Sequence, residues 1–378
     1  MIQLTRHTVL LAGFVAVATA RVCRNLTVPI SISAQNIKFT LQAPANDIEV
    51  TNFFLDLAQP GVNFTQSVLN SNDSFATITG NYSIGATYCE PDSGPGSALQ
   101  ILTHGIAFDR SYWDFSFANH NYSYANAALA RNYSVFFYDR LGLGGSSRGD
   151  PVTEIQTNLE LAALYALTSK LRNAEVSGVP AYEKLVHVGH SYGSILSYAL
   201  VQANPTGLSD GLVLTGFAQA ATASYSAFFT FGGNYVVARN ASTSLVGYPA
   251  GYMASGDRTG VQTNFFAPNN FDPAVLQAAY ESNQPVTVGE IMTLGSGATG
   301  NNTFGGPVLI ITGERDIPFC GGNCDSTNPP IPDQSGQYFT NTNNFDAIVV
   351  PKTGHSLNME YTAATTYTSI LDFLDQSV

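Results

Sequence analysis

The chain has few charged side chains, and basic ones are the scarcer kind. Lys, Arg, Asp and Glu make up 11% of its 378 residues, and 15 basic against 27 acidic side chains give a formal net charge of −12. Nucleic acids and anionic membranes attract clusters of Lys and Arg, and the sequence has no basic patch. We therefore expect neither as a partner.

Long apolar runs are also scarce. The main one lies near the N-terminus, where Arg6 and His7 precede TVLLAGFVAVA and Ala18-Thr19-Ala20 follows. It is shorter than the roughly 20 residues that span a bilayer, so a membrane anchor is disfavoured, as is a buried first helix. The layout is typical of a secretory signal peptide. We predict that residues 1–20 are a signal peptide and that the protein is secreted, extracellular and not stably inserted in a membrane.

Potential glycosylation sites agree with secretion. An Asn-x-Ser/Thr triplet marks a possible glycan acceptor on the surface of a secreted protein. Because the chain is rich in Asn, Ser and Thr, some of these triplets are expected by chance. The acceptors are Asn25, Asn63, Asn72, Asn81, Asn121, Asn132, Asn240 and Asn301.

Cysteine is rare, with four residues. An even number in a secreted chain indicates two disulfides, and four cysteines allow three pairings. We favour Cys23–Cys89, which would tie down the N-terminal segment, and Cys320–Cys324, which would close the loop CGGNC. The second spacing is not the C-x-x-C of redox enzymes, and no His pair accompanies it as zinc would require. No metal or organic cofactor is predicted.

The chain has two parts that differ in their pattern of apolar residues. From Lys38 to Cys89 polar and apolar side chains alternate, punctuated by Asn and Gly, so we predict that residues 21–97 form an antiparallel β meander joined to the core sheet. From Ala98 onward, apolar strands without alternation are separated by helical patterns, which predicts an α/β fold with a mostly parallel sheet. Such sheets carry their active groups at the carboxyl ends of the strands. The strands are ALQILTHG, VFFYDRLG, KLVHVGH, GLVLTGF, PVLIITGE and AIVVPKTG.

One segment without a clear strand interrupts the alternation of strands and helices. Residues 217–304 are rich in aromatics, Gly, Ser, Asn and Pro, and a structureless loop of that length is improbable in a compact domain. We interpret it as a mainly helical cap or lid. The core then comprises residues 98–216 and 305–378.

The pattern Gly189-His190-Ser191-Tyr192-Gly193 follows the strand KLVHV and precedes a helical pattern. The five-residue match alone is weak, because Gly and Ser are common in the chain. Its place between strand and helix is typical of a nucleophile elbow, in which flanking glycines permit a sharp turn. We predict that Ser191 is a nucleophile; the alternative is a helix start capped by this serine.

A serine nucleophile needs a histidine base. His355 follows the last apolar strand and precedes a helix, where this architecture supplies its base. The other histidines are less suitable: His7 leaves with the signal peptide, His187 lies inside a strand, His190 is expected to point away from Ser191, and His120 lies in an apparent surface loop.

A carboxylate must orient the imidazole. Asp316 follows the penultimate strand and completes the chain order Ser, Asp, His. Glu314 and Asp325 compete in the same loop, whereas Asp210 precedes its strand and should lie at the wrong edge.

An oxyanion hole requires two backbone N–H groups. Tyr192, directly after the nucleophile, is one candidate. Ile106 is the other, because Gly105 permits close approach in the turn after ALQILTHG; we expect His104 to organise that turn without moving protons.

These motifs together resemble the α/β-hydrolase superfamily over about three quarters of the chain. The matching residues are HG at 104, YDRLGLGGSS at 138–147, GHSYG at 189, TGERD at 312 and TGH at 353. The second segment is similar to a D-x-R-G-x-G-x-S turn of epoxide hydrolases, proline iminopeptidases and esterases. That resemblance implies that Asp139 and Arg140 tie loops together near the site. With its secretion signal and sequons, the chain also resembles secreted serine hydrolases of filamentous fungi.

Departures from these subfamilies narrow the expected reaction. Epoxide hydrolases and haloalkane dehalogenases have Asp at the elbow, where Ser191 stands. The lipase-type HGGG loop is replaced by HGIA, and the cap has few of the acids with which proline iminopeptidases bind an ammonium group.

We predict a serine esterase that acts on an ester or lactone of an apolar or aromatic small molecule. Alternatives are a proline iminopeptidase, a lyase or C–C hydrolase with the same triad, or a non-catalytic binding protein. The oligomeric state stays open. Aromatic candidates for substrate contact are Tyr112, Trp113, Phe228, Phe229 and Phe231.

Overall fold

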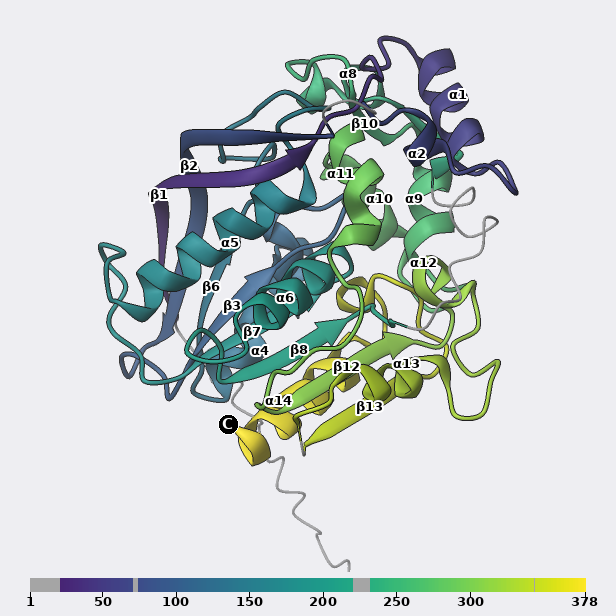
Figure 1. Ribbon diagram of the computed structural model, residues 1–378. Helices are drawn as coiled ribbons and strands as arrows, with labels where there is room; N and C mark the ends of the chain where they lie inside the picture. Colours follow the sequence, from purple (N-terminus) through teal and green to yellow (C-terminus); the bar gives the residue numbers. More distant parts are fainter. Residues whose placement is uncertain (1–20, 71–73, 220–231, 343) are drawn as a thin grey trace, which may run out of the picture.

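The computed structural model of the protein describes residues 21–70, 74–219, 232–342 and 344–378 (Figure 1). The predicted signal peptide, Asn72, Phe228, Phe229 and Phe231 lie outside these ranges.

An eight-stranded sheet forms the centre of the protein, with the order β1-β2-β6-β3-β7-β8-β12-β13. The pairings from β6 to β13 are parallel, and those of β1 with β2 and β2 with β6 are antiparallel. The predicted α/β class is therefore confirmed. The strands are β1 (Arg21–Ile37), β2 (Phe75–Pro91), β3 (Leu99–Thr103), β6 (Ser134–Tyr138), β7 (Leu185–His190), β8 (Gly211–Thr215), β12 (Val308–Gly313) and β13 (Phe345–Val350).

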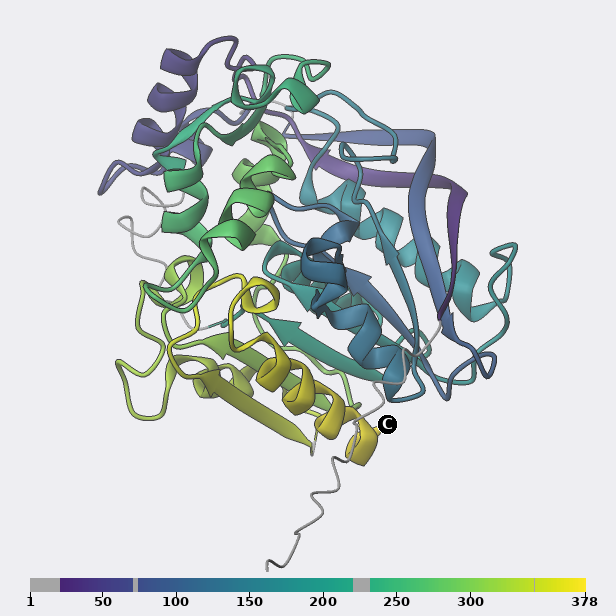
Figure 2. The ribbon, with the colours of Figure 1, turned by 180° about the vertical axis from the view of Figure 1, so that it is seen from behind.

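The parallel strands are predominantly apolar because both of their faces are covered. Every residue of β3, β6, β7, β8 and β12 is buried, whereas the edge strand β13 is only partly so. Helices cover both faces of the sheet (Figure 1, Figure 2). One face carries α5 (Thr157–Arg172) and α6 (Tyr192–Ala203), and the opposite face carries α4 (Tyr124–Ala130) and α14 (Ala363–Ser377). No described helix is long and apolar enough to cross a membrane.

The predicted meander is wrong in its middle part. β1 and β2 pair along their whole length, from Arg21↔Pro91 to Ile37↔Phe75, and residues between them leave the sheet. They include two helices, α1 (Asp47–Leu57) and α2 (Phe64–Ser67). Asn46 caps α1 by accepting a hydrogen bond from the N–H of Glu49, and Val50, Phe53 and Phe54 form its buried face at helical spacing.

Both disulfides have the predicted pairing. Cys23 and Cys89 face each other in the register of β1 and β2. Cys320 and Cys324 close the short loop that follows β12. The hairpin register explains the first pairing, because directly opposed residues bring their Cβ atoms within bonding reach.

The chain between β8 and β12 forms the expected insertion, but it contains strands as well as helices. β9 (Tyr235–Val237), β10 (Tyr252–Ser255) and β11 (Val286–Thr287) make a three-stranded antiparallel sheet. Strands of two to four residues are too short to produce an alternating pattern. The helices are α8 (Ala238–Ala241), α9 (Arg258–Phe265), α10 (Pro273–Glu281) and α11 (Val288–Thr293).

The segment between β1 and β2 packs against this insertion. The ring of Phe54 lies 5.5 Å from that of Tyr235, and Asp47 accepts a hydrogen bond from the N–H of Val237. Figure 1 places α1 and α2 at the same end of the molecule as α8 to α11. Segments far apart in sequence thus form one layer beyond the sheet.

Shorter elements complete the described chain. They are β4 (Asp114–Phe115), α3 (Phe117–His120), β5 (Tyr122–Ser123), α12 (Ile317–Cys320), α13 (Ile331–Gln334) and the 3₁₀ turns at 110–113, 243–245, 294–296, 335–338 and 357–359.

Replacing Cys23 and Cys89 together by Ala should lower the free energy of unfolding by about 2–5 kcal/mol, because their bond closes a long loop in the unfolded chain. Their sequence separation is 66, against 4 for Cys320 and Cys324. The corresponding Cys320→Ala/Cys324→Ala protein should lose less, and urea unfolding of both measures the difference. Equal losses would contradict the chain-entropy argument.

Candidate active site

Ser191 occupies a sharp turn between β7 and α6, with φ 55° and ψ −118°. Two glycines make this turn possible. A Cβ at Gly189 would lie 2.5 Å from the carbonyl oxygen of Gly193, and a Cβ at Gly193 would overlap the carbonyl oxygen of Thr103 on β3. A non-glycine residue with positive φ is strained, so the close fit of backbone around Ser191 stabilises a conformation that places Oγ at the carboxyl edge of the sheet, within reach of His355.

His355 lies in the loop after β13, within reach of this serine. Its Nε2 lies 2.8 Å from Oγ of Ser191, and its Nδ1 lies 2.6 Å from Oδ2 of Asp316. Since a carboxylate only accepts, Nδ1–H donates to Asp316 and Nε2 accepts from the serine hydroxyl. The three side chains predicted from the sequence therefore form one continuous hydrogen-bonded chain.

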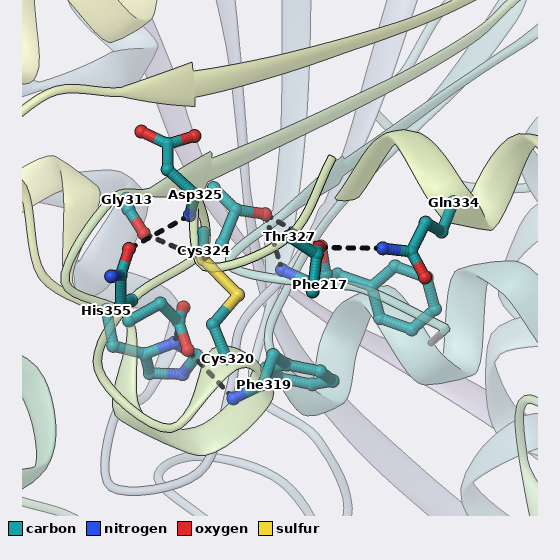
Figure 3. The surroundings of a disulfide bond; sticks show 12 residues. Phe217, Gly313, Phe319, Cys320, Cys324, Asp325, Thr327, Gln334 and His355 are labelled. Atoms are coloured by element: carbon teal, nitrogen blue, oxygen red, sulfur yellow. Dashed lines mark hydrogen bonds and ion pairs between the residues drawn. A yellow bond between two sulfur atoms is a disulfide. The ribbon is translucent and has the colours of Figure 1, made fainter. Parts of the chain in front are cut away.

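Asp316 follows β12 and begins α12. It is fully buried, and its Oδ1 accepts a hydrogen bond from the N–H of Phe319. The Cys320–Cys324 disulfide follows in the same loop. The Sγ atom of Cys324 contacts the carbonyl oxygen of Gly313 (Figure 3). Both oxygens of the carboxylate are thus held, so the orientation of Asp316 is set by the cross-linked loop.

The two predicted oxyanion donors are Tyr192, which directly follows Ser191, and Ile106, whose neighbour Gly105 lies against Ser191. Tyr192 opens α6, where a first-turn N–H has no acceptor within the helix. Gly105 lies against the nucleophile, because a Cβ there would be 2.8 Å from Cβ of Ser191. Ile106 follows it and is buried. Two backbone N–H groups next to the serine are the arrangement that stabilises an oxyanion.

The competing residues have other partners. His187 is buried between Thr168 and Ser209, and Nδ1 of His104 contacts the carbonyl oxygen of Gly105. His120 pairs with Asp114. Among the acids, Glu314 accepts from the N–H of Lys352, Asp210 pairs with Arg172 at the other sheet edge, and Asp325 is exposed.

His190 was expected to point away from Ser191, but its position relative to His355 was not predicted. Its ring lies 4.9 Å from the ring of His355 and stacks on Tyr112 at 4.3 Å. Burial, together with the nearby His355 and His104, holds the pKa of His190 well below its usual value. A neutral imidazole therefore packs beside His355, a position that the elbow pattern alone does not specify.

Aromatic rings surround His355. Phe265 and Phe319 stack near it at 5.9 and 5.8 Å, and Phe108 contacts Phe265 at 5.1 Å. Tyr112 is fully buried and stacks on the ring of His190, which in turn lies next to His355. Trp113 is also fully buried, between Tyr112 and Tyr124, so its position is in the core and not at a substrate surface.

A buried guanidinium connects the insertion to the elbow. Arg140 pairs with Glu160 on α5 and with Glu290 on α11, and all three side chains are almost fully buried. The guanidinium lies 4.6 Å from the ring centre of Tyr192. Burial raises the pKa of Glu160, and the guanidinium of Arg140 opposes this shift. Arg140 was expected to hold loops together near the site, and its contact with Tyr192 adds a link to the residue that follows Ser191.

Asp139 connects a second pair of loops. Its carboxylate accepts hydrogen bonds from Arg110 and from the N–H of Gly145.

A second buried carboxyl joins the histidine loop to the insertion. Glu360 accepts hydrogen bonds from the N–H groups of Gly354 and Ala267 and from the side chain of Asn270. Burial raises its pKa to about 7, against the lowering effect of these hydrogen bonds. The loop that carries His355 is therefore attached to the segment after α9.

Seven of the predicted glycan acceptors lie in the described part of the chain, and all seven are exposed. Within the same part, no group of three or more His, Cys, Asp or Glu residues could hold a metal ion.

With fold and site in view, the chain belongs to the Alpha/beta hydrolase family, whose profile matches residues 100–366. Three solved structures illustrate the likeness. An esterase of Thermogutta terrifontis is 15% identical, with 78% of this chain and 94% of that chain covered and a TM-score of 0.50. A candidate lipase of Acinetobacter baumannii is 16% identical, with coverage of 78% and 88% and a TM-score of 0.52.

The third is a candidate non-haem bromoperoxidase of Mycobacterium tuberculosis, 14% identical, with coverage of 78% and 96% and a TM-score of 0.51. At these identities the similarity establishes the fold alone. No curated protein matches the chain in sequence.

Replacing Arg140 by Met should lower the free energy of unfolding by about 3–5 kcal/mol, because Glu160 and Glu290 would stay buried without their partner. The triple variant Arg140→Met/Glu160→Gln/Glu290→Gln should recover much of this loss. Urea unfolding measures both, and a single variant as stable as the native protein would disprove the role of the ion cluster.

Glu360 should make the protein less stable as the pH rises from about 4.5 to about 7. In this range the folded carboxyl keeps a proton that the unfolded one has lost, so unfolding free energy falls by at most about 1.4 kcal/mol per pH unit. Above the folded pKa its contribution is constant.

Urea unfolding across this range should give a flatter profile for Glu360→Gln than for the native protein. Glu314→Gln, which removes a half-buried carboxyl from a neighbouring loop, is the control. The same slope in native and Glu360→Gln proteins would show that another group causes it.

Proposed function

We propose that this protein is a secreted serine hydrolase that cleaves an ester or lactone of an apolar or aromatic small molecule through an acyl-enzyme intermediate. The observation that carries the proposal is the hydrogen-bonded chain from Ser191 through His355 to Asp316. Each distance is within the range at which a base can take the proton of a serine nucleophile.

In the first half-reaction, Oγ of Ser191 attacks the ester carbonyl while Nε2 of His355 removes its proton. Asp316, which accepts from Nδ1, keeps the imidazole in the required tautomer and stabilises the imidazolium. The N–H groups of Tyr192 and Ile106 donate to the tetrahedral oxyanion. His355 then protonates the leaving alcohol, and the acyl group stays on Ser191.

In the second half-reaction, a water molecule attacks the acyl-enzyme. His355 takes a proton from this water, and the oxyanion again lies at Tyr192 and Ile106. When the tetrahedral intermediate collapses, His355 returns the proton to Oγ of Ser191 and the acid is released.

The aromatic surroundings favour an apolar substrate. Phe265, Phe319 and Phe108 lie around His355 and its neighbours, and Ser191 itself is only 8% exposed. Desolvation of a charged group at such a position is costly. Groups bound directly beside the triad should therefore be apolar or aromatic.

Secretion is supported by several independent features. The described chain contains two disulfides, as is common in oxidising compartments. The described sequons are exposed, and the first residues have the layout of a signal peptide.

Replacing Ser191 by Ala should lower kcat for p-nitrophenyl acyl esters by roughly 10⁴- to 10⁶-fold, because the nucleophile is lost. The far-UV circular dichroism and the thermal midpoint should match those of the native protein. Activity that survives this change would overturn the proposal.

Mass spectrometry separates the alternative reactions. A fluorophosphonate should label Ser191 in the native protein and leave the His355→Ala variant much less labelled, since the base activates the serine. An acyl adduct trapped on Ser191 supports ester or lactone hydrolysis. Turnover without an adduct would indicate a lyase, and absence of both would indicate a binding protein.

A further inference from the structure

A pocket of about 480 Å³ lies beside the candidate active site, between α9 of the insertion and the loop that follows β12. One wall is formed by α9 and its continuation, including Gln262 and Phe266. The opposite wall is formed by Arg315, Ile317 and the backbone of Gly322. None of these residues belongs to the hydrogen-bonded chain of Ser191, His355 and Asp316.

Each wall of the pocket contains residues that are next to residues of the triad or in contact with it. Arg315 and Ile317 are the two neighbours of Asp316 in sequence. Phe266 directly follows Phe265, whose ring stacks on His355 and whose carbonyl accepts from the N–H of Ser356. The pocket therefore adjoins the histidine side of the site.

This side is where the alcohol part of an ester must lie. His355 donates its proton to the leaving oxygen, so the leaving group has to be next to Nε2 while the carbonyl oxygen faces the oxyanion donors. We infer that an alcohol part long enough to extend beyond Phe265 would reach the pocket.

The lining has one charged residue. Arg315 is exposed, and within the described chain its side chain has no ion pair or side-chain hydrogen bond. Thr259 and Gln262 add exposed polar side chains on the opposite wall. A guanidinium binds planar oxyanions through two parallel hydrogen bonds.

The position of Arg315 is fixed by its backbone. Its N–H donates to the carbonyl of Thr353, and the N–H of Gly322 donates to the carbonyl of Asp316. The Cys320–Cys324 disulfide closes the same loop. Because the backbone of Arg315 is fixed, only the freedom of its side chain has to be lost when an anion binds.

We propose that this pocket binds a carboxylate on the alcohol part of the substrate, so that the preferred esters are those of hydroxy acids with an apolar or aromatic body. A single guanidinium balances one negative charge and matches the planar geometry of a carboxylate. This inference rests on the proposed ester hydrolysis and specifies its substrate class.

The test compares two substrates of equal shape: the acetate ester of para-hydroxyphenylpropionate and the acetate ester of the matching propionamide. In both substrates a saturated side chain separates the carboxylate or the amide from the phenol ring. The two phenols are therefore similar as leaving groups. The native protein should have the higher kcat/KM for the carboxylate. In Arg315→Gln the carboxylate-to-amide ratio should fall by about three- to tenfold, mainly through KM, the size expected of one partly exposed charged hydrogen bond.

Arg258→Gln is the matched control. Arg258 is an exposed cation on α9 that pairs with Gln277 and does not line the pocket. The native ratio should persist in this variant. A ratio unchanged by Arg315→Gln, or lowered equally by both variants, would overturn the proposal.

A binding measurement distinguishes failure of this proposal from failure of ester hydrolysis. In the Ser191→Ala protein, calorimetry should detect para-hydroxyphenylpropionate, and adding Arg315→Gln should weaken its binding. If neither ester is cleaved but this binding depends on Arg315, the proposed reaction alone is wrong. If both esters are cleaved and binding ignores Arg315, the carboxylate site alone is wrong.

Discussion

The backbone of Ser191 passes from β7 into α6 within one residue, and the remaining groups of the site are placed relative to that turn. Gly189 and Gly193 approach other backbone so closely that a Cβ at either position would collide with a carbonyl oxygen. The collision at Gly193 involves Thr103, the last residue of β3. The elbow therefore depends on the neighbouring strand, and the same neighbour leads into Gly105 and Ile106. One steric constraint thus brings Ser191 close to Gly105 and to the start of α6.

Buried polar groups then attach the insertion to this centre. Arg140 connects Glu290 of α11 to the core helix α5 and to the ring of Tyr192, while Glu360 connects the loop of His355 to Ala267. Buried charges and carboxyls of this kind are costly unless they are paired. Their pairing links the position of the insertion to that of Tyr192 and of the loop that carries His355.

Much of the fold was predictable because burial on both faces leaves a strong signal. Uninterrupted apolar strands alternate with helices, and only a parallel sheet covered on two sides uses such a sequence. The hairpin helix α1 was not predicted, since VTNFFLDL contains alternation as well as helical spacing and its cap at Asn46 decides between them. The short strands β9 to β11 were not predicted because pairing, not composition, defines them.

The sequence by itself determined the order of the chemistry: a serine between two glycines after one strand, and an acid and a histidine after the last two. These positions follow from chain order because the carboxyl ends of parallel strands meet at one edge. Only the tertiary structure decided that His190 packs beside His355, that Arg140 lies under Tyr192 and that Arg315 faces a pocket. Such contacts join residues separated by loops and by the whole insertion, and their geometry depends on packing that no local pattern encodes. Five residues of sequence were enough to single out Ser191, but they did not predict the side chains that surround it.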